Sequence, residues 1–188
     1  MSDTDDRPLR QLSKRLSWAL RHAAAELGLL IDPEGFVAID DLIKALGSDR
    51  PMTRAQIAEV VTALAPEKQR FEIRDGWIRA NYGHSLATRI EHPNRPPPPL
   101  LFHGTSLAAL PAIKLDGLRP MNRQYVHLCT DPDLATQVGA RHGPPVLLRV
   151  NAAAAHRAHV PFYCANPHFW LADHVPRSSL NIADHPMP

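Results

Sequence analysis

The sequence lacks the signatures of several large classes of enzymes. Among its 188 residues are only two cysteines, Cys129 and Cys164, and without CxxC spacing they indicate neither a zinc site nor a disulfide framework. No GxxxxGK(S/T) loop and no GxGxxG fingerprint occurs, so neither a P-loop nor a Rossmann nucleotide site is supported. HExxH and GxSxG are absent as well, and the eleven histidines show no metal-ligand spacing. We therefore expect an enzyme or binding protein that needs no metal.

The chain also has little net charge and no long apolar run. Its formal net charge is only +2, so any site for a polyanion must be a local cluster. Four of the 21 basic residues are lysines and the rest are arginines, which grip phosphate better, although high-GC codon usage would give the same bias. The beginning, MSDTDDRPLR, is unlike a signal peptide. We expect a cytoplasmic protein that is not associated with a membrane.

The pattern of apolar residues and turns predicts an α+β fold with two lobes. In residues 1–92, helices precede a β-hairpin across Asp75-Gly76, the order found in winged-helix modules. Within this lobe we expect a strand over 36–39, a helix capped by Asp40 and another capped by Thr53. Residues 93–99 form a proline-rich linker. Residues 100–188 predict a mainly antiparallel β lobe with short helices near 107–115 and 134–140.

An arginine–histidine pair stands where an apolar helical stripe ends. Leu9, Leu12, Leu16 and Leu20 recur at helical spacing, and Arg21-His22 follow at once. A fixed guanidinium beside a group that titrates near neutrality suits the binding and turnover of a phosphate. A solvated helix end is the simpler interpretation of this pair alone.

Two further arginines and two histidine motifs extend the candidate set. Arg70 lies at the edge of a strand and Arg123 in a turn, and with Arg21 and His22 they would neutralise a phosphate dianion if they converge. His103-Gly104-Thr105 follows a strand at 100–102 and precedes a helix, where glycine allows a ligand close to the backbone and a helix N-terminus receives an anion. His127 lies among apolar residues, a pattern more typical of a core histidine than of a ligand.

Eight blocks of the sequence resemble the RNA 2′-phosphotransferase family (the KptA and yeast tRNA 2′-phosphotransferase type), in the same order. They include LSKRLSWALRH, GLLIDPEGFVAIDDLI, KQRFEI, IRANYGHS, LFHGT, GLRPMNRQYVHL, VGARHGPPVLLRV and FYCANPHFWLADHVP. The chain departs from the family pattern at Tyr82, where the family has glutamine, at Cys129, where it has serine, and at Pro167-His168.

The resemblance implies a winged-helix lobe followed by an ADP-ribosyltransferase-like lobe. It places the family's catalytic set on Arg21, His22, Arg70 and Arg123. It also places the binding of NAD, the co-substrate, on His103, Gly104, Thr105 and His127.

The implied reaction removes an internal 2′-phosphate from RNA, as at a tRNA splice junction, by way of an ADP-ribosylated RNA 2′-phosphate. Nicotinamide and ADP-ribose 1″,2″-cyclic phosphate are released. We expect RNA as the partner and a monomeric enzyme. Two alternatives stay open: an ADP-ribosyltransferase that caps terminal phosphates of RNA or DNA, and a non-catalytic winged-helix nucleic-acid-binding protein.

Overall fold

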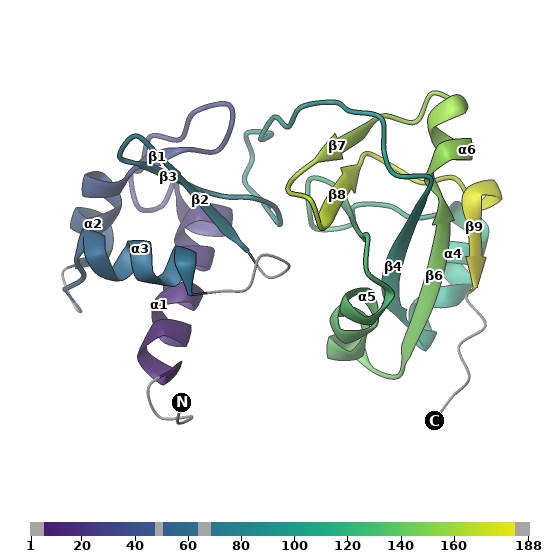
Figure 1. Cartoon of the computed structure of the whole chain (residues 1–188), viewed down its shortest axis with the longest axis horizontal. Helices are drawn as coiled ribbons and strands as arrows, with labels where there is room; N and C mark the ends of the chain where they lie inside the picture. Colours follow the sequence, from purple (N-terminus) through teal and green to yellow (C-terminus); the bar gives the residue numbers. More distant parts are fainter. Residues whose placement is uncertain (1–5, 48–50, 64–68, 183–188) are drawn as a thin grey trace. The chain divides into compact units, whose positions relative to one another are not determined.

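The computed structural model describes residues 6–47, 51–63 and 69–182, and the chain divides into two compact units, Met1–Glu91 and His92–Pro188 (Figure 1). Each unit has its own hydrophobic core. Both units combine helices with an antiparallel sheet, which confirms the predicted α+β class. The winged-helix and ADP-ribosyltransferase-like character of the two lobes stays a prediction.

The first unit packs helices against a small antiparallel sheet of strand order β1-β3-β2. Its described elements are α1 (Asp6–Trp18), the π-helical turn η1 (Ala19–Ala23), β1 (Val37–Ala38), α2 (Ile39–Gly47), α3 (Arg54–Thr62), β2 (Phe71–Arg74) and β3 (Trp77–Ala80). Apolar side chains from these elements are removed from water together, which stabilises the unit. Its fully buried members include Leu16, Leu20, Leu42, Ile57, Phe71 and Ile78.

Two local signals in this unit are confirmed. Thr53 caps α3 in a capping box, in which its hydroxyl accepts from the Gln56 N–H while the Gln56 side chain accepts from the Thr53 N–H. The hairpin turns at Asp75 and Gly76, whose φ angles of 50° and 83° are the left-handed values that a two-residue hairpin loop requires.

The strand expected over 36–39 is shorter than predicted. Only Val37–Ala38 pairs with β3, and α2 already begins at Ile39, whose N–H donates to the carbonyl of Gly76. Asp40 is therefore not the cap of this helix. It lies in the first turn, where its carboxylate accepts two hydrogen bonds from the Arg54 guanidinium at 2.9 and 2.6 Å.

The second unit is built on a six-stranded antiparallel sheet of order β7-β8-β5-β4-β6-β9. The strands are β4 (Leu100–Ser106), β5 (Val126–Cys129), β6 (Pro145–Asn151), β7 (Phe162–Cys164), β8 (Phe169–Ala172) and β9 (Leu180–Ile182). The α-helices described here are α4 (Leu110–Asp116), α5 (Pro132–Gly139) and α6 (Ala152–Arg157). The described residues of this unit also form three short 3-10 turns, η3 (Leu107–Ala109), η4 (Ala140–His142) and η5 (Arg177–Ser179).

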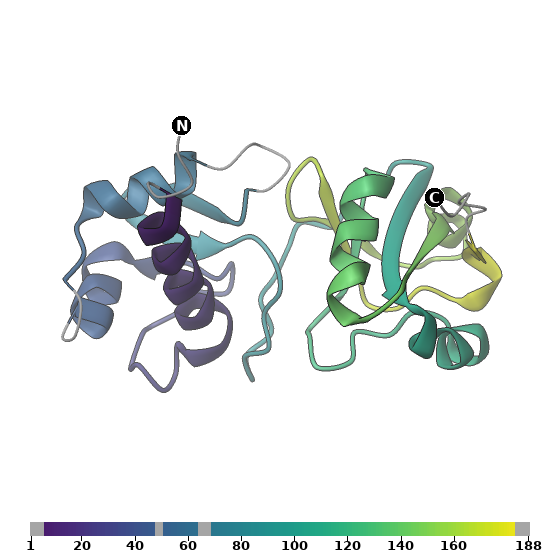
Figure 2. The same cartoon turned by 90° about the horizontal axis from the view of Figure 1, so that it is seen from below.

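Helix α5 lies against one face of β4 and β6 (Figure 2). Two glycines allow this approach. A Cβ on Gly104 would overlap the carbonyl oxygen of Ala135, and a Cβ on Gly139 would stand 2.8 Å from the backbone nitrogen of Thr105. Because no side chain fits at either position, the two backbones pack in direct contact.

The segment expected to be a linker is in part ordered against the second unit. The Arg95 N–H donates to the Phe162 carbonyl at 2.9 Å, and Asn94 forms an isolated antiparallel bridge with Tyr163. The polypeptide before β4 therefore extends the edge of the sheet beside β7.

Candidate active site

The Arg21-His22 pair lies in the π-helical turn that ends α1. Leu20 and Ala23 of this turn are buried, whereas Arg21 and His22 are half-buried at the rim of the core. This is the position predicted for them at the end of the apolar stripe. π-Helical turns are rare and concentrate at functional sites, since they redirect side chains relative to an α-helix.

The segment after β3, here called the 82–85 segment (Tyr82, Gly83, His84 and Ser85), holds this pair. The guanidinium carbon of Arg21 lies 5.1 Å from the centre of the Tyr82 ring, a cation–π contact. A Cβ on Gly83 would stand 3.4 Å from Nη1 of Arg21, so the guanidinium lies close along the glycine backbone. Arg21 thus lies against both an aromatic ring and a stretch of main chain that carries no side chain.

Ser85 contacts both members of the pair. Its N–H donates to the carbonyl of Arg21 at 3.0 Å, and its hydroxyl lies 2.8 Å from Nδ1 of His22. Because Ser85 occupies Nδ1, contact with a substrate would fall to Nε2 of the imidazole.

Arg70 lies beside the same stretch of chain. Its carbonyl accepts from the N–H of Asn81 at 2.8 Å, one step beyond the Phe71–Ala80 pair of the hairpin. In the described ranges no acidic side chain pairs with the half-buried Arg70. Asn81 leads directly into the 82–85 segment, so the backbone of Arg70 is joined to the stretch of chain that contacts Arg21 and His22.

Sequence reasoning left this supporting stretch unassigned. The sequence RANYGHS is compatible with a simple strand exit, and only its membership in the resembling blocks marked it. The contacts of Tyr82, Gly83 and Ser85 depend on the closure of the hairpin onto a distant helix end. Spacing along the chain does not reveal such contacts.

In the second unit, His103 is fixed by the backbone of His127. Nδ1 of His103 lies 2.9 Å from the His127 carbonyl, an oxygen that only accepts, so Nδ1 carries the proton. Burial lowers the pKa of His103, and the hydrogen bond to His127 offsets this only in part. The ring is therefore neutral near pH 7, and its Nε2 is a hydrogen-bond acceptor.

The surroundings of Gly104 and Thr105 differ from the expectation. Strand β4 continues through both residues to Ser106, so they lie inside a strand and not in a strand-to-helix turn. The space that a side chain of Gly104 would occupy is filled by the backbone of α5. This glycine therefore allows the close packing of β4 and α5. The N–H of Leu107, at the start of η3, donates to the Pro144 carbonyl and is not directed at an anion.

Arg123 lies in the exposed turn before β5, as predicted. Its N–H donates to the Pro120 carbonyl at 3.1 Å, which closes the turn. Met121, inside this turn, has a φ of 56°, so the backbone is in the left-handed region there.

Other reactive groups offer no competing centre among the described residues. Burial raises the pKa of the Cys129 thiol to about 12, which leaves it protonated and unreactive at neutral pH. No cluster of three or more His, Cys, Asp or Glu side chains suited to a metal occurs in the described ranges. No described helix is both long and apolar enough to cross a bilayer.

Comparison with known proteins places these residues in one family. The model of the RNA 2′-phosphotransferase, Tpt1/KptA family matches residues 7–174. The chain belongs to this family. A probable RNA 2′-phosphotransferase of Streptomyces coelicolor is 44% identical over 173 residues, covering 92% of this chain and 94% of that protein. Similar proteins of Trichormus variabilis and Agrobacterium fabrum, also named probable RNA 2′-phosphotransferases, are 39% and 42% identical over 92% and 91% of this chain.

The Tpt1/KptA match extends across both units. The pairwise matches to the relatives cover 95% of the Trichormus protein and 92% of the Agrobacterium protein, so these relatives have nearly the same length as the matched region. Residues 7–174 include all eight candidate residues, from Arg21 to His127. The family assignment therefore applies to the lobe with the Arg21-His22 pair as well as to the lobe with His103.

Proposed function

We propose that this member of the Tpt1/KptA family is an NAD-dependent RNA 2′-phosphotransferase that removes an internal 2′-phosphate of the kind left at a tRNA splice junction. The observation that carries the proposal is the ordering of Arg21 and His22 by residues 82–85, next to Asn81, whose N–H is bonded to the carbonyl of Arg70. A surface arginine is ordinarily mobile, whereas Arg21 is held against Tyr82 and Gly83. An ordered guanidinium binds a phosphate at a smaller cost in side-chain entropy.

The arginines bind the RNA 2′-phosphate and balance its charge. Arg21 and Arg70 donate charge-assisted hydrogen bonds to its oxygens, and Arg123 of the second unit is assigned to the same group by family resemblance. Phosphoryl transfer requires positioning and electrostatic stabilisation above all, and fixed cations supply both.

NAD, the co-substrate, supplies an electrophilic ribose carbon, C1″, that accepts the 2′-phosphate as nicotinamide leaves, and a 2″-hydroxyl that then takes the phosphoryl group. His22, with Nδ1 on Ser85, presents Nε2 to this chemistry. There it hydrogen-bonds the phosphate or takes the proton of the 2″-hydroxyl. In either role Ser85 would orient the imidazole ring of His22.

The second unit offers groups suited to NAD. The neutral His103 presents Nε2 as an acceptor for a ribose hydroxyl or an amide N–H. We propose that His103, Gly104, Thr105 and His127 contribute to this site, with Gly104 acting through its backbone because α5 fills its side-chain direction. We further propose that the enzyme is a cytoplasmic monomer, which light scattering on the purified protein tests for its oligomeric state.

The decisive experiment combines the purified protein, a short RNA with one internal 2′-phosphate, and NAD, in the presence of a chelator. We expect 2′-hydroxyl RNA, nicotinamide and ADP-ribose 1″,2″-cyclic phosphate. A persistent ADP-ribosylated RNA would favour an enzyme that caps phosphates. No consumption of NAD would favour a nucleic-acid-binding protein.

Variants of the arginines test the assignment of residues. R70A and R123A each remove charge-assisted hydrogen bonds worth about 1.5–3 kcal/mol, so single-turnover rates should fall roughly ten- to over a hundredfold. R177A removes an exposed arginine outside the candidate set and is the matched control. An R123A enzyme with an unchanged rate would contradict the role of Arg123.

A further inference from the structure

The first unit has a pocket that the proposed reaction does not use. Its lining residues are Asp32, Phe36, Arg74, Asp75 and Trp77, and its volume is about 280 Å³. It lies at the turn end of the β2–β3 hairpin, whereas Arg70 and Asn81 lie at the open end.

The pocket and Arg70 belong to one face of the hairpin. Arg74 pairs with Trp77 and Glu72 with Arg79, so these four side chains share the face opposite the buried Phe71 and Ile78. The alternation extends to Arg70, whose carbonyl bonds to Asn81 in the same register. Arg70 and Arg74 are four residues apart on one strand, a distance of about 13 Å.

The guanidinium of Arg74, the indole of Trp77 and the Phe36 ring line the pocket, and the Arg79 guanidinium packs against the same Phe36 ring. The guanidinium carbon of Arg74 lies 4.3 Å from the centre of the buried Phe36 ring, and that of Arg79 lies 4.6 Å from it. Trp77 is 44% exposed, an unusual exposure for so large an apolar group. The indole and the guanidinium offer flat surfaces on which a planar ring can stack.

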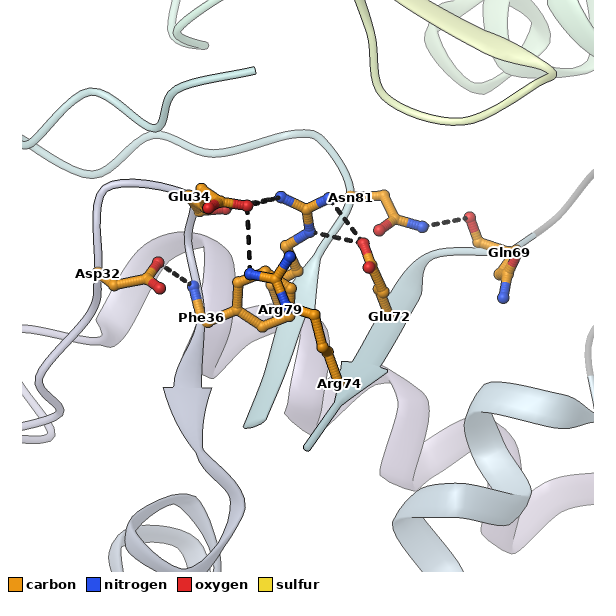
Figure 3. A network of polar contacts seen from close by, with 8 residues as sticks. All are labelled: Asp32, Glu34, Phe36, Gln69, Glu72, Arg74, Arg79 and Asn81. Atoms are coloured by element: carbon orange, nitrogen blue, oxygen red, sulfur yellow. Dashed lines mark hydrogen bonds and ion pairs between the residues drawn. The ribbon is translucent and has the colours of Figure 1, made fainter. Parts of the chain in front are cut away.

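A network of ion pairs fixes these walls (Figure 3). Glu34 contacts Arg74 at 3.3 Å, and Arg79 pairs with Glu72 at 2.6 Å. Asp32 accepts from the N–H of Phe36 at 2.8 Å, which closes the turn beneath the ring. Of the lining side chains, Asp32 and Arg74 are therefore held by contacts that exist before any ligand arrives.

The acidic residues that line the pocket indicate which kind of ligand it can bind. The carboxylates of Asp32 and Asp75 line the pocket and would repel a phosphate, but they accept hydrogen bonds from N–H groups. The exocyclic amino groups of adenine, cytosine and guanine are such donors, whereas uracil has no amino group and offers only its ring N3–H. A planar ring with an amino group matches both the walls and the rim.

We propose that this pocket binds a single-stranded nucleobase carrying an exocyclic amino group, in the RNA on one side of the 2′-phosphate. Single-stranded bases are recognised in this way, by stacking on aromatic and arginine planes and by hydrogen bonds to their edges. The inference deepens the proposed function and rests on it for the nature of the RNA. Its prediction concerns RNA binding, which is measurable without turnover.

The test uses the full chain and fluorescence anisotropy of labelled oligouridine that carries a single adenine, cytosine or guanine at each position in turn. Each RNA is prepared with and without an internal 2′-phosphate. We expect one position, close to the phosphate, at which an amino-bearing base lowers Kd relative to uracil. W77A should raise Kd for that RNA roughly 5- to 150-fold, and W77F should retain most of the affinity.

Two further variants separate stacking from charge. D75N should reduce the preference for an amino-bearing base over uracil. K44A removes one exposed positive charge from the same unit, outside the pocket, and should leave Kd within about twofold. Circular dichroism of each variant verifies that the fold is retained.

Equal Kd values for W77A and the unaltered protein on every RNA would overturn the pocket, even if the enzyme removes 2′-phosphates normally. Dependence on Trp77 in a protein without phosphotransferase activity would retain the pocket and overturn the proposed function. A third outcome concerns the fluorescence of Trp77, which is isolated by comparison with W77F. If a lysine-rich peptide quenches it and RNA does not, the pocket binds a cation and the nucleobase assignment is wrong.

Discussion

The hydroxyl oxygen of Ser85 lies 2.8 Å from Nδ1 of His22, although 63 positions separate the two residues in the sequence. The N–H of the same serine donates to the carbonyl of Arg21. One residue thus bonds to two adjacent members of the candidate catalytic set, one through its side chain and one through its main chain. If His22 has the proposed catalytic role, we expect Ser85 to act through it.

S85A should lower the single-turnover rate by about 2- to 12-fold, the effect of one lost hydrogen bond of about 0.5–1.5 kcal/mol. KM for the RNA should change little, because the arginines remain. Ser85→Thr keeps the hydroxyl and should restore much of the rate. S178A, which changes an exposed serine in the second unit, is the control. Equal rates for S85A and S178A would show that Ser85 does not orient His22.

Y82A should weaken the binding of 2′-phosphorylated RNA, because Arg21 loses the ring that it lies against. Cation–π contacts contribute about 0.5–2 kcal/mol, which corresponds to a rise in Kd of roughly 2- to 30-fold. Y82F keeps the ring and should bind like the unaltered protein. If Y82A weakens unphosphorylated RNA by the same factor, the ring contacts RNA directly and does not act through Arg21.

His103 should make the stability of the second unit depend on pH. Burial lowers its pKa below the ordinary value of 6.5, so at acidic pH the unfolded chain binds a proton that the folded chain does not. The stabilisation is complete above pH 6.5 and is lost as the pH falls toward the lowered pKa. Tm should therefore drop more steeply between pH 7 and pH 5 in the unaltered protein than in H103N, whose amide N–H can replace Nδ1–H as donor. Parallel curves would contradict a buried neutral imidazole.

G104A should destabilise the second unit strongly, by about 3 kcal/mol or more, because the new methyl group overlaps the backbone of α5. G47A places a methyl group at the end of α2, where no described atom apart from the chain neighbours and the helix's own backbone lies within 4 Å, and should be close to neutral. Denaturant unfolding of both variants measures the difference. A mild effect of G104A would mean that α5 moves away from β4 easily.

The sequence predicted those parts of the structure that depend on local chemistry. The Asp75-Gly76 turn, the cap at Thr53 and the position of Arg21-His22 at the end of an apolar stripe all follow from residues close together in the chain. The prediction that Asp40 caps α2 was wrong. The N–H of Ile39 donates to the carbonyl of Gly76, a residue distant in the sequence, and this contact sets where the strand ends.

The parts that escaped prediction depend on contacts between distant segments. The spacing of residues along the sequence could not reveal that Gly104 contacts α5, since the tripeptide His103-Gly104-Thr105 would equally suit a ligand-binding turn. Nor could it show Ser85 beside His22, or the Arg74 guanidinium over Phe36. The catalytic and NAD-binding roles of the eight candidate residues stay predictions that rest on the family.

The 81–85 stretch has a consequence for how this protein acquires activity. It follows β3 without an intervening residue, and Asn81 continues the pairing of the hairpin up to Arg70. A slip of one residue in that pairing would turn Arg70 to the opposite face of the sheet and carry Tyr82 and Ser85 away from the end of α1. Formation of the hairpin and assembly of the proposed phosphate-binding groups are thus expected to be one event, and a chain with a misaligned hairpin should be both partly unfolded and inactive.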